Sequence, residues 1–302
     1  MPQTVLVAGA TGMLGSRIAH HALAEPDAKV RLLVRPGTMD NPVKRALLSP
    51  LLAAGAEIIQ GDLANRASLD KATMGVDVIV SAVQGGQDVI LDGQLALLDA
   101  AKKNGVRRIL PSDYALDLFE TPEGEHPPYD MRRAADKVIA ASGLEHVHIL
   151  NGVFMDVFLS PRSMFDQETS TARFWGGGHE RFGATSVEDT ARFVARAALD
   201  RGLPSGKFAV AGQVLSFEDV TSAFEQVTGR TYSRERLGSV AELRAFIVSK
   251  RSGDPMAVMS ATYMLYMVTD VAALRDMQNE RYPDIQPQSF VEFLRHALDH
   301  AG

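Results

Sequence analysis

The stretch that decides the fold is VLVAGATGMLG at residues 5–15, an apolar run followed by a turn with three glycines. Apolar residues then repeat at helical spacing over Leu14, Ile18, Ala22 and Leu23. A strand, a tight turn and a helix in this order are typical of a dinucleotide-binding fingerprint. Gly9 permits the turn, Gly12 lets backbone N–H groups approach a pyrophosphate, and Gly15 allows close helix–strand packing. The alternative is a glycine-rich turn that binds nothing.

Outward from this turn, short β-branched runs alternate with segments long enough for a helix. Six such runs are at residues 5–9, 30–34, 57–61, 78–83, 107–111 and 146–150. Runs that are apolar on both faces fit a parallel sheet covered by helices on both sides. Because parallel crossovers are right-handed, the pattern predicts an α/β fold with a doubly wound parallel sheet of the Rossmann type.

In the second half of the chain the alternation of predicted strands and helices gives way to a series of predicted helices. Four capping boxes announce helices there: Ser186 with Asp189, Ser216 with Asp219, Ser239 with Glu242, and Ser289 with Glu292. One strand is predicted at residues 208–212. We therefore expect residues 1–152 to form the dinucleotide-binding domain and residues 153–302 a smaller, mainly helical substrate-binding region. The boundary is approximate, and the two parts are allowed to interleave.

A cation follows the second predicted strand. Arg35 stands twenty positions after Gly15, where a protein that prefers NAD places an acid for the ribose hydroxyls. A guanidinium grips a 2′-phosphate, and Lys44 adds a second charge, so NADPH is the predicted cofactor. The alternative is two solvated surface cations.

Two further strand ends are weaker candidates for cofactor contact. Asp62 and Leu63 follow the third strand and are predicted to contact adenine. Ala82, Val83 and Gln84 follow the fourth and are predicted to pass under the nicotinamide ribose. The alternative roles are a helix cap for Asp62 and a plain turn for the second segment.

The amino-acid composition excludes several classes of binding partner and of metal site. The 302 residues carry a formal charge of −6 and no cysteine. That charge disfavours nucleic acid and anionic membranes, and the absence of thiols excludes disulfides and thiolate metal sites. Since the start of the chain has no signal-peptide pattern, we expect a cytoplasmic protein. We also expect a monomer or homodimer whose partner is a small-molecule substrate.

In order and spacing, residues 33–36, 41–44, 61–63, 76–81 and 109–114 resemble the NmrA-like atypical short-chain dehydrogenases. Within that group they resemble the branch of isoflavone reductase and phenylcoumaran benzylic ether reductase, over about residues 3 to 160. The resemblance implies an NADPH-dependent oxidoreductase. It implies that NADPH is held by Gly9, Thr11, Gly12, Met13, Leu14, Arg35 and Lys44. It also implies that the nicotinamide ring and substrate lie by Asn151, Gly152 and Phe154.

One position departs from the family. Arg132 stands where the family has an active-site lysine, counted eleven residues back from Gly143. Arginine keeps its proton and cannot relay one, although it can hold a ribose or an oxyanion. Tyr129 and Arg133 have the Tyr-x-x-x-basic spacing in which a cation lowers the pKa of a phenol. Tyr129 as acid with Arg132 or Arg133 orienting it is thus the catalytic hypothesis; the alternative is an exposed helix start.

Other candidates are weaker. His126 is a second possible acid or a solvated loop residue. His146 and His148 share one strand face, but without a carboxylate cluster nearby in sequence we predict packing and no metal. Phe158, Phe174 and Trp175 are predicted either to wall a substrate pocket or to belong to the core.

Three functions fit these patterns. The first is a reductase that transfers hydride from NADPH to a small aromatic or conjugated substrate of the benzylic ether, ketone or quinone type. The second is a non-catalytic regulator that senses NADP(H), and the third is a quinone reductase with a loosely specified pocket. The fold alone does not separate them, because function resides in the site.

Overall fold

The computed structural model describes residues 2–160 and 163–299. The chain folds into two compact units that interleave along the sequence. The first unit consists of Met1–Tyr114, Pro128–Ile149 and Thr190–Phe208. The second unit consists of Ala115–Pro127, Leu150–Asp189 and Ala209–Gly302.

The main sheet has the strand order β11-β6-β5-β4-β1-β2-β3. Its strands are β1 Gln3–Ala8, β2 Ala28–Val34, β3 Glu57–Gln60, β4 Val78–Ser81, β5 Arg108–Leu110, β6 Glu145–Leu150 and β11 Gly206–Ala209. The pairs from β3 through to β6 are parallel. The predicted doubly wound parallel sheet is therefore confirmed. The strand predicted at 208–212 overlaps β11 only at residues 208 and 209, because β11 begins two residues earlier and ends at Ala209, at the edge of this sheet.

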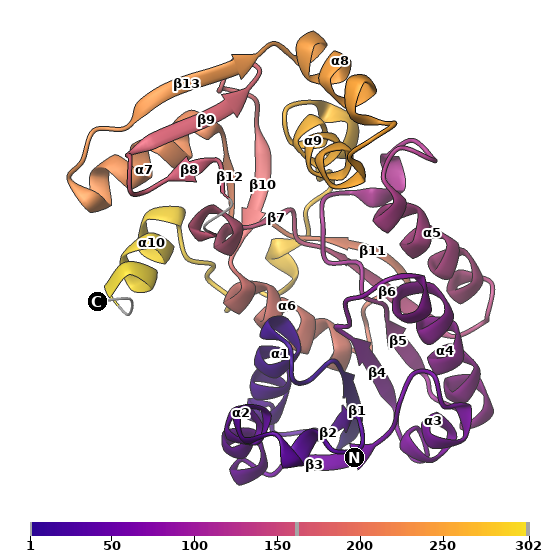
Figure 1. Ribbon diagram of the computed structural model, residues 1–302. Coiled ribbons are helices and arrows are strands. Elements are labelled where there is room, and N and C mark those ends of the chain that lie inside the picture. The colour runs from indigo at the N-terminus through magenta and orange to yellow at the C-terminus, as the bar shows by residue number, and fades with distance from the viewer. Residues whose placement is uncertain (1, 161–162, 300–302) are drawn as a thin grey trace. The chain divides into compact units, whose positions relative to one another are not determined.

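Helices cover both faces of this sheet. They are α1 Met13–Ala24, α2 Pro42–Ala53, α3 Arg66–Ala72, α4 Gln94–Lys103, α5 Pro127–Ala140 and α6 Val187–Leu199. Figure 1 shows α1 and α2 on one side of the sheet and α3, α4 and α5 on the other. Apolar side chains from both layers are fully buried, among them Leu6, Ile79, Leu97, Ile109 and Ile139. Burial on both faces explains why these strands are continuous apolar runs.

The order of the strands creates a switch point. From β1 the chain proceeds to β2 and β3 on one side, and then returns to place β4 on the other side of β1. The helices that follow these two strands, α1 after β1 and α4 after β4, therefore lie on opposite faces of the sheet (Figure 1). Doubly wound proteins bind ligands at such a point.

The second unit contains more strand than the sequence indicated. One small sheet joins β12 Gln213–Leu215, β10 Phe182–Thr185 and β7 Val153–Phe154. Another joins β13 Ser233–Gly238, β9 Thr171–Trp175 and β8 Phe165–Asp166. The remaining helices are α7 Phe217–Thr228, α8 Val240–Lys250, α9 Pro255–Met267 and α10 Phe290–Asp299.

All four predicted capping hydroxyls accept the expected backbone N–H. Within residues 2–160 and 163–299, no helix combines the length and apolar character that a membrane span requires.

Candidate functional site

The glycine turn between β1 and α1 is packed as its residue types require. Gly9 has φ +85°, and a Cβ there would lie 2.3 Å from the carbonyl oxygen of Ala82. A Cβ on Gly15 would lie 2.3 Å from the carbonyl oxygen of Gly9. Side chains at either position would therefore separate the turn from its neighbours. The structural part of the predicted roles of Gly9 and Gly15 is confirmed.

The amino end of α1 is open. Its N-cap is Gly12, which is exposed, and no side chain of the described residues caps the helix. Thr11, Met13 and Leu14 form the rest of this rim, with Met13 56% exposed. Uncapped N–H groups and the helix dipole favour an anion at such an end. A phosphate group therefore fits this turn, since the residues present leave both space and donors for it.

The segment after β4 lies directly against this turn. The N–H of Ala82 donates to the carbonyl of Ala8 at 2.9 Å, and Gly9 packs on the Ala82 carbonyl. Val83 is half-buried, and Gln84 is exposed. The structure thus brings together two segments that were predicted separately as cofactor contacts.

Arg35 is exposed immediately after β2. Lys44 lies in the first turn of α2, whose N-cap Asn41 accepts the N–H of Val43 and of Lys44 at 3.1 Å. The cap, three residues before Lys44, fixes the start of this helix at Pro42. Both cations follow the carboxyl end of β2, the strand next to β1.

Asp62 makes a turn of its own after β3. Its Oδ1 accepts the N–H of Ala64 at 2.9 Å, whereas Asn65 is the N-cap of α3. The helix-cap alternative for Asp62 is therefore wrong. Leu63 packs partly buried against the core of the first unit.

The segment after β5 is hydrogen-bonded to the end of β4 and to the residues that follow it. Ser112 Oγ donates to the Val83 carbonyl at 2.7 Å, and Tyr114 Oη donates to the Ser81 carbonyl at 3.0 Å. Burial, with the charge of Asp113 second, raises the pKa of Tyr114 above its usual range. Tyr114 therefore keeps the proton that it donates to Ser81.

Arg132 bridges α5 to this same segment. Its Nε donates to the Ser112 carbonyl at 2.9 Å, and its Nη1 donates to the Pro128 carbonyl at 2.8 Å. Arg133 forms an ion pair with Asp130 one turn earlier. Tyr129 is 3% exposed, so the exposed-helix alternative does not apply to it. Arg132 is thus held by two carbonyls, and Arg133 has a carboxylate partner.

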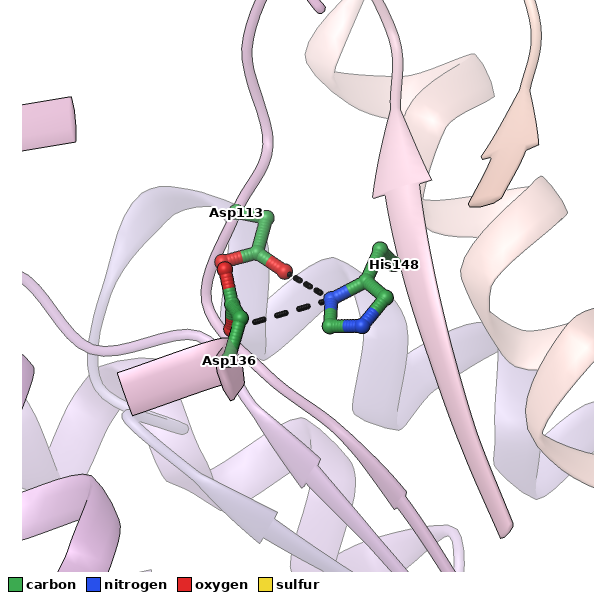
Figure 2. Close-up of side chains that lie close together, drawn as sticks. All are labelled: Asp113, Asp136 and His148. Atoms are coloured by element: carbon green, nitrogen blue, oxygen red, sulfur yellow. Dashed lines mark hydrogen bonds and ion pairs between the residues drawn. The ribbon is translucent and has the colours of Figure 1, made fainter. Parts of the chain in front are cut away.

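Two buried carboxyls lie beside His148, a cluster that the sequence did not predict (Figure 2). His148 Nδ1 lies 2.7 Å from Oδ2 of Asp113 and 3.7 Å from Oδ1 of Asp136. Asp113 follows β5, Asp136 lies on α5, and His148 lies on β6. Burial, the charge of Asp113 and a hydrogen bond to it raise the pKa of Asp136 far above its usual range, although Arg132 opposes this shift.

The expected pairing of the strands could have predicted that Asp113 and His148 lie close together. Ile109 pairs with His146 in the parallel register of β5 and β6. Continuing that register places His148 beside the residues that leave β5, where Asp113 stands. Asp136 has no comparable signal, because its approach depends on how α5 packs.

In the second unit, Asn151 follows β6 and is fully buried. Neither atom of its side-chain amide has a hydrogen-bond partner among the described residues. A buried amide without a partner is rare and is typical of a ligand contact or an ordered water. Phe154 is half-buried in β7.

The aromatic residues of the second unit form a core. Phe158 contacts Phe165 and Phe290 edge to face at 5.6 and 5.5 Å, and Phe174 stacks on Phe217 at 6.2 Å. The core alternative is therefore correct for Phe158 and Phe174, each 4% exposed. Trp175 packs on Phe246.

His126 is 5% exposed, which excludes the solvated-loop alternative. Its ring lies 6.3 and 6.1 Å from the rings of Tyr263 and Tyr266. His126 therefore packs among tyrosines in the second unit.

Comparison with known proteins gives consistent matches. The profile of the NmrA-like family matches residues 1–294. The phenylcoumaran benzylic ether reductase IRL1 of Ginkgo biloba is 26% identical over 306 residues, covering 96% of this chain and 97% of that protein. Leucoanthocyanidin reductase of Vitis vinifera, solved as a binary complex with NADPH, has a TM-score of 0.82 at 22% identity and covers 96% of this chain and 97% of its own. AtPrR2, solved with NADP+ and (+)-pinoresinol, has a TM-score of 0.83 at 24% identity and covers 98% of both chains.

Proposed function

This chain belongs to the NmrA-like family, and on that premise we propose that it is an NADPH-dependent reductase. Its proposed substrate is a small aromatic or conjugated molecule of the benzylic ether, ketone or quinone type. The names of its relatives support a reductase, since they include a benzylic ether reductase and a leucoanthocyanidin reductase. The substrate class is proposed from these names and from the predicted site.

The observation that carries the cofactor proposal is the glycine turn at the switch point of the sheet. The exposed, uncapped start of α1 offers backbone donors to a pyrophosphate. Residues 82–84 lie against that turn, and we propose that they pass under the nicotinamide ribose. In the second unit, the unpartnered amide of Asn151 is proposed to contact the cofactor.

Preference for NADPH is assigned to Arg35. Replacing Arg35 with alanine is expected to raise the Kd for NADPH about 10- to 100-fold, because a charge-assisted bond to the 2′-phosphate contributes about 1.5–3 kcal/mol. The Kd for NADH should stay unchanged, since NADH has no 2′-phosphate. Fluorescence titration with both coenzymes measures the two constants.

Arg45, exposed one residue after Lys44, gives a matched control. The variant Arg45→Ala removes a surface cation without removing the predicted contact, so its Kd for NADPH should equal that of the wild type. Equal weakening of NADPH by both variants would instead indicate nonspecific attraction.

Bound NADPH supplies a hydride from its nicotinamide ring. The chain's own contribution is to hold donor and acceptor in alignment and to stabilise the oxyanion that develops. Tyr129 is proposed to donate the proton. Arg132, fixed by the carbonyls of Ser112 and Pro128, is proposed to orient the reacting groups.

The variant Tyr129→Phe tests the proton donor. Turnover is expected to fall about 100-fold or more, because general acid catalysis contributes about that much. The Kd for NADPH should not change. Steady-state NADPH oxidation with a panel of aryl ketones, quinones and benzylic ethers measures turnover.

Tyr232→Phe removes a buried hydroxyl in the second unit and serves as the control. Wild-type turnover by Tyr129→Phe would remove Tyr129 from the mechanism.

One observation favours a second candidate, a regulator that binds NADP(H) without turnover. Arg132 stands at the family's lysine position and is held by two carbonyls, so it cannot relay a proton. Tight NADPH binding without oxidation by any compound of the panel would support the regulator. Oxidation by quinones alone would support a quinone reductase.

A further inference from the structure

We propose that Asp113 and Asp136 share one proton and that Asp136, acting through Asp113, is a positioning residue for the proposed cofactor site. The positioning role rests on the proposed function, whereas the shared proton rests on geometry alone.

The first step is the burial of two adjacent carboxyls. Asp113 is 0% exposed and Asp136 is 2% exposed. One carboxyl oxygen of Asp113, one of Asp136 and one ring nitrogen of His148 all lie within 4.8 Å of one another. Figure 2 shows the two carboxyl groups side by side, with the His148 ring facing both. Two buried carboxyls at such a separation are not both ionised, because like charges in a low dielectric repel strongly.

The second step is hydrogen-bond satisfaction. When both carboxyls are ionised, Oδ1 of Asp113 and both oxygens of Asp136 have no donor among the described residues. One proton on Asp136 converts an acceptor into a donor that faces Asp113. Asp113 then accepts from Asp136 and, through Oδ2, from Nδ1 of His148 at 2.7 Å. A single proton thus removes the main defect of the cluster.

The charged and titratable groups around the pair come from three elements. They are Arg132 and the Arg133–Asp130 ion pair on α5, His146 and His148 on β6, and Tyr114 after β5. Arg132 favours ionisation of Asp136, but burial and the charge of Asp113 outweigh it and raise the pKa of Asp136.

The third step connects the pair to the predicted cofactor site. Asp113 stands between Ser112 and Tyr114, whose hydroxyls donate to the carbonyls of Val83 and Ser81. Arg132 donates to the carbonyl of Ser112. The side chain of Asp113 therefore anchors a segment that holds both the Ala82–Gln84 segment and Arg132. Ionisation of both carboxyls would push Asp113 away and loosen these contacts.

The first readout is the dependence of stability on pH. The folded chain keeps the Asp136 proton, and the unfolded chain loses it near pH 4, so stability falls as pH rises above that value. The melting midpoint of wild type should therefore fall, relative to Asp136→Asn, by about 2 °C per pH unit between about pH 5 and pH 9. Asp136→Asn stays neutral at every pH and donates an amide N–H instead.

Two further variants complete this readout. Asp113→Asn removes the charge and the hydrogen bond that help to raise the pKa of Asp136, although burial still raises it, so this variant should reduce the pH dependence and serves if Asp136→Asn does not fold. Asp99→Asn removes an exposed carboxylate on α4, 58% exposed as a side chain, and should keep the wild-type slope. The infrared spectrum of wild type should contain the carbonyl band of a protonated carboxyl. The spectrum of Asp136→Asn should lack this band, so the band should remain in the difference between the two spectra.

The second readout is NADPH affinity at pH 7. Asp136→Asn should bind NADPH within about twofold of wild type, because its amide still donates to Asp113. Asp136→Ala removes the donor and should weaken binding about tenfold. Rescue by asparagine but not by alanine distinguishes a hydrogen-bonding role from the filling of space.

Three results would overturn the proposal. The first is a wild-type pH slope retained by both asparagine variants, and the second is equal NADPH affinity in Asp136→Asn and Asp136→Ala. The third is a rise in the wild-type midpoint with Zn²⁺ that EDTA and Asp136→Asn each abolish, since a cation would then lie between the carboxyls. If the wild type did not bind NADPH, the proposed function would fail, while the pH slopes would still decide on the proton.

Discussion

Replacing Arg108 with alanine is expected to lower the free energy of unfolding by about 3–5 kcal/mol, because it breaks a buried and fully bonded charge. Arg108 is 1% exposed. Its guanidinium donates to the carbonyls of Ala197, Asp200 and Leu203 at 2.9, 2.5 and 2.7 Å, and to Glu145 at 2.9 Å. It thereby ties the carboxyl end of α6 to β5.

Urea unfolding measures this loss. Arg108→Lys keeps the charge but lacks the fork that reaches several carbonyls, so it should recover only part of the stability. Arg66→Ala is the matched control, since that side chain is 70% exposed and its pairing with Asp99 contributes little. A loss below about 1 kcal/mol for Arg108→Ala would show that the surrounding carbonyls find other donors.

Gly9→Ala should lose both stability and NADPH binding, whereas Gly12→Ala should lose NADPH affinity alone. A methyl group at Gly9 would require φ +85° and would lie 2.3 Å from a backbone oxygen, so we expect a loss of at least about 3 kcal/mol and of NADPH binding. Gly12 has φ −91°, and a methyl there meets only the Gly9 oxygen at 3.2 Å. Gly12→Ala should therefore fold but bind NADPH at least about tenfold more weakly, since the methyl fills the space proposed for the pyrophosphate.

Thermal melting and coenzyme titration of the two variants separate stability from binding. Gly55→Ala, at φ +101° with no atom within 4 Å of the added Cβ, is a control for backbone strain without a clash. Normal NADPH affinity in Gly12→Ala would place the pyrophosphate elsewhere.

The first unit was predictable because its strands are buried on both faces. Val78–Ser81 is entirely buried, and such a run is distinctive in sequence. The small sheets of the second unit lack this property. Ser233–Gly238 has five exposed residues and an arginine–glutamate pattern, so nothing in its hydropathy indicates a strand. Its pairing with β9 depends on residues distant in sequence.

The cofactor side of the candidate site was more predictable than the catalytic side. Glycines at 9 and 15 carry a steric requirement that is visible in their spacing, and the structure contains the predicted turn at Gly9, with positive φ, and the predicted close packing at Gly15. The partners of Arg132 and Arg133 were not foreseeable, because a carbonyl such as that of Ser112 carries no sequence signal. Asp113 and Asp136 are twenty-three positions apart and meet only because α5 packs beside β5.

The position of β11 in the sheet has a consequence for synthesis on the ribosome. This strand completes the edge beside β6, yet it is translated after Leu150–Asp189, which belongs to the second unit. The nascent chain therefore cannot complete the main sheet until residues near 208 have emerged. During that interval β6 is the edge strand of the sheet and its outer backbone groups are unpaired. A chaperone that binds exposed strands would therefore bind the nascent chain there.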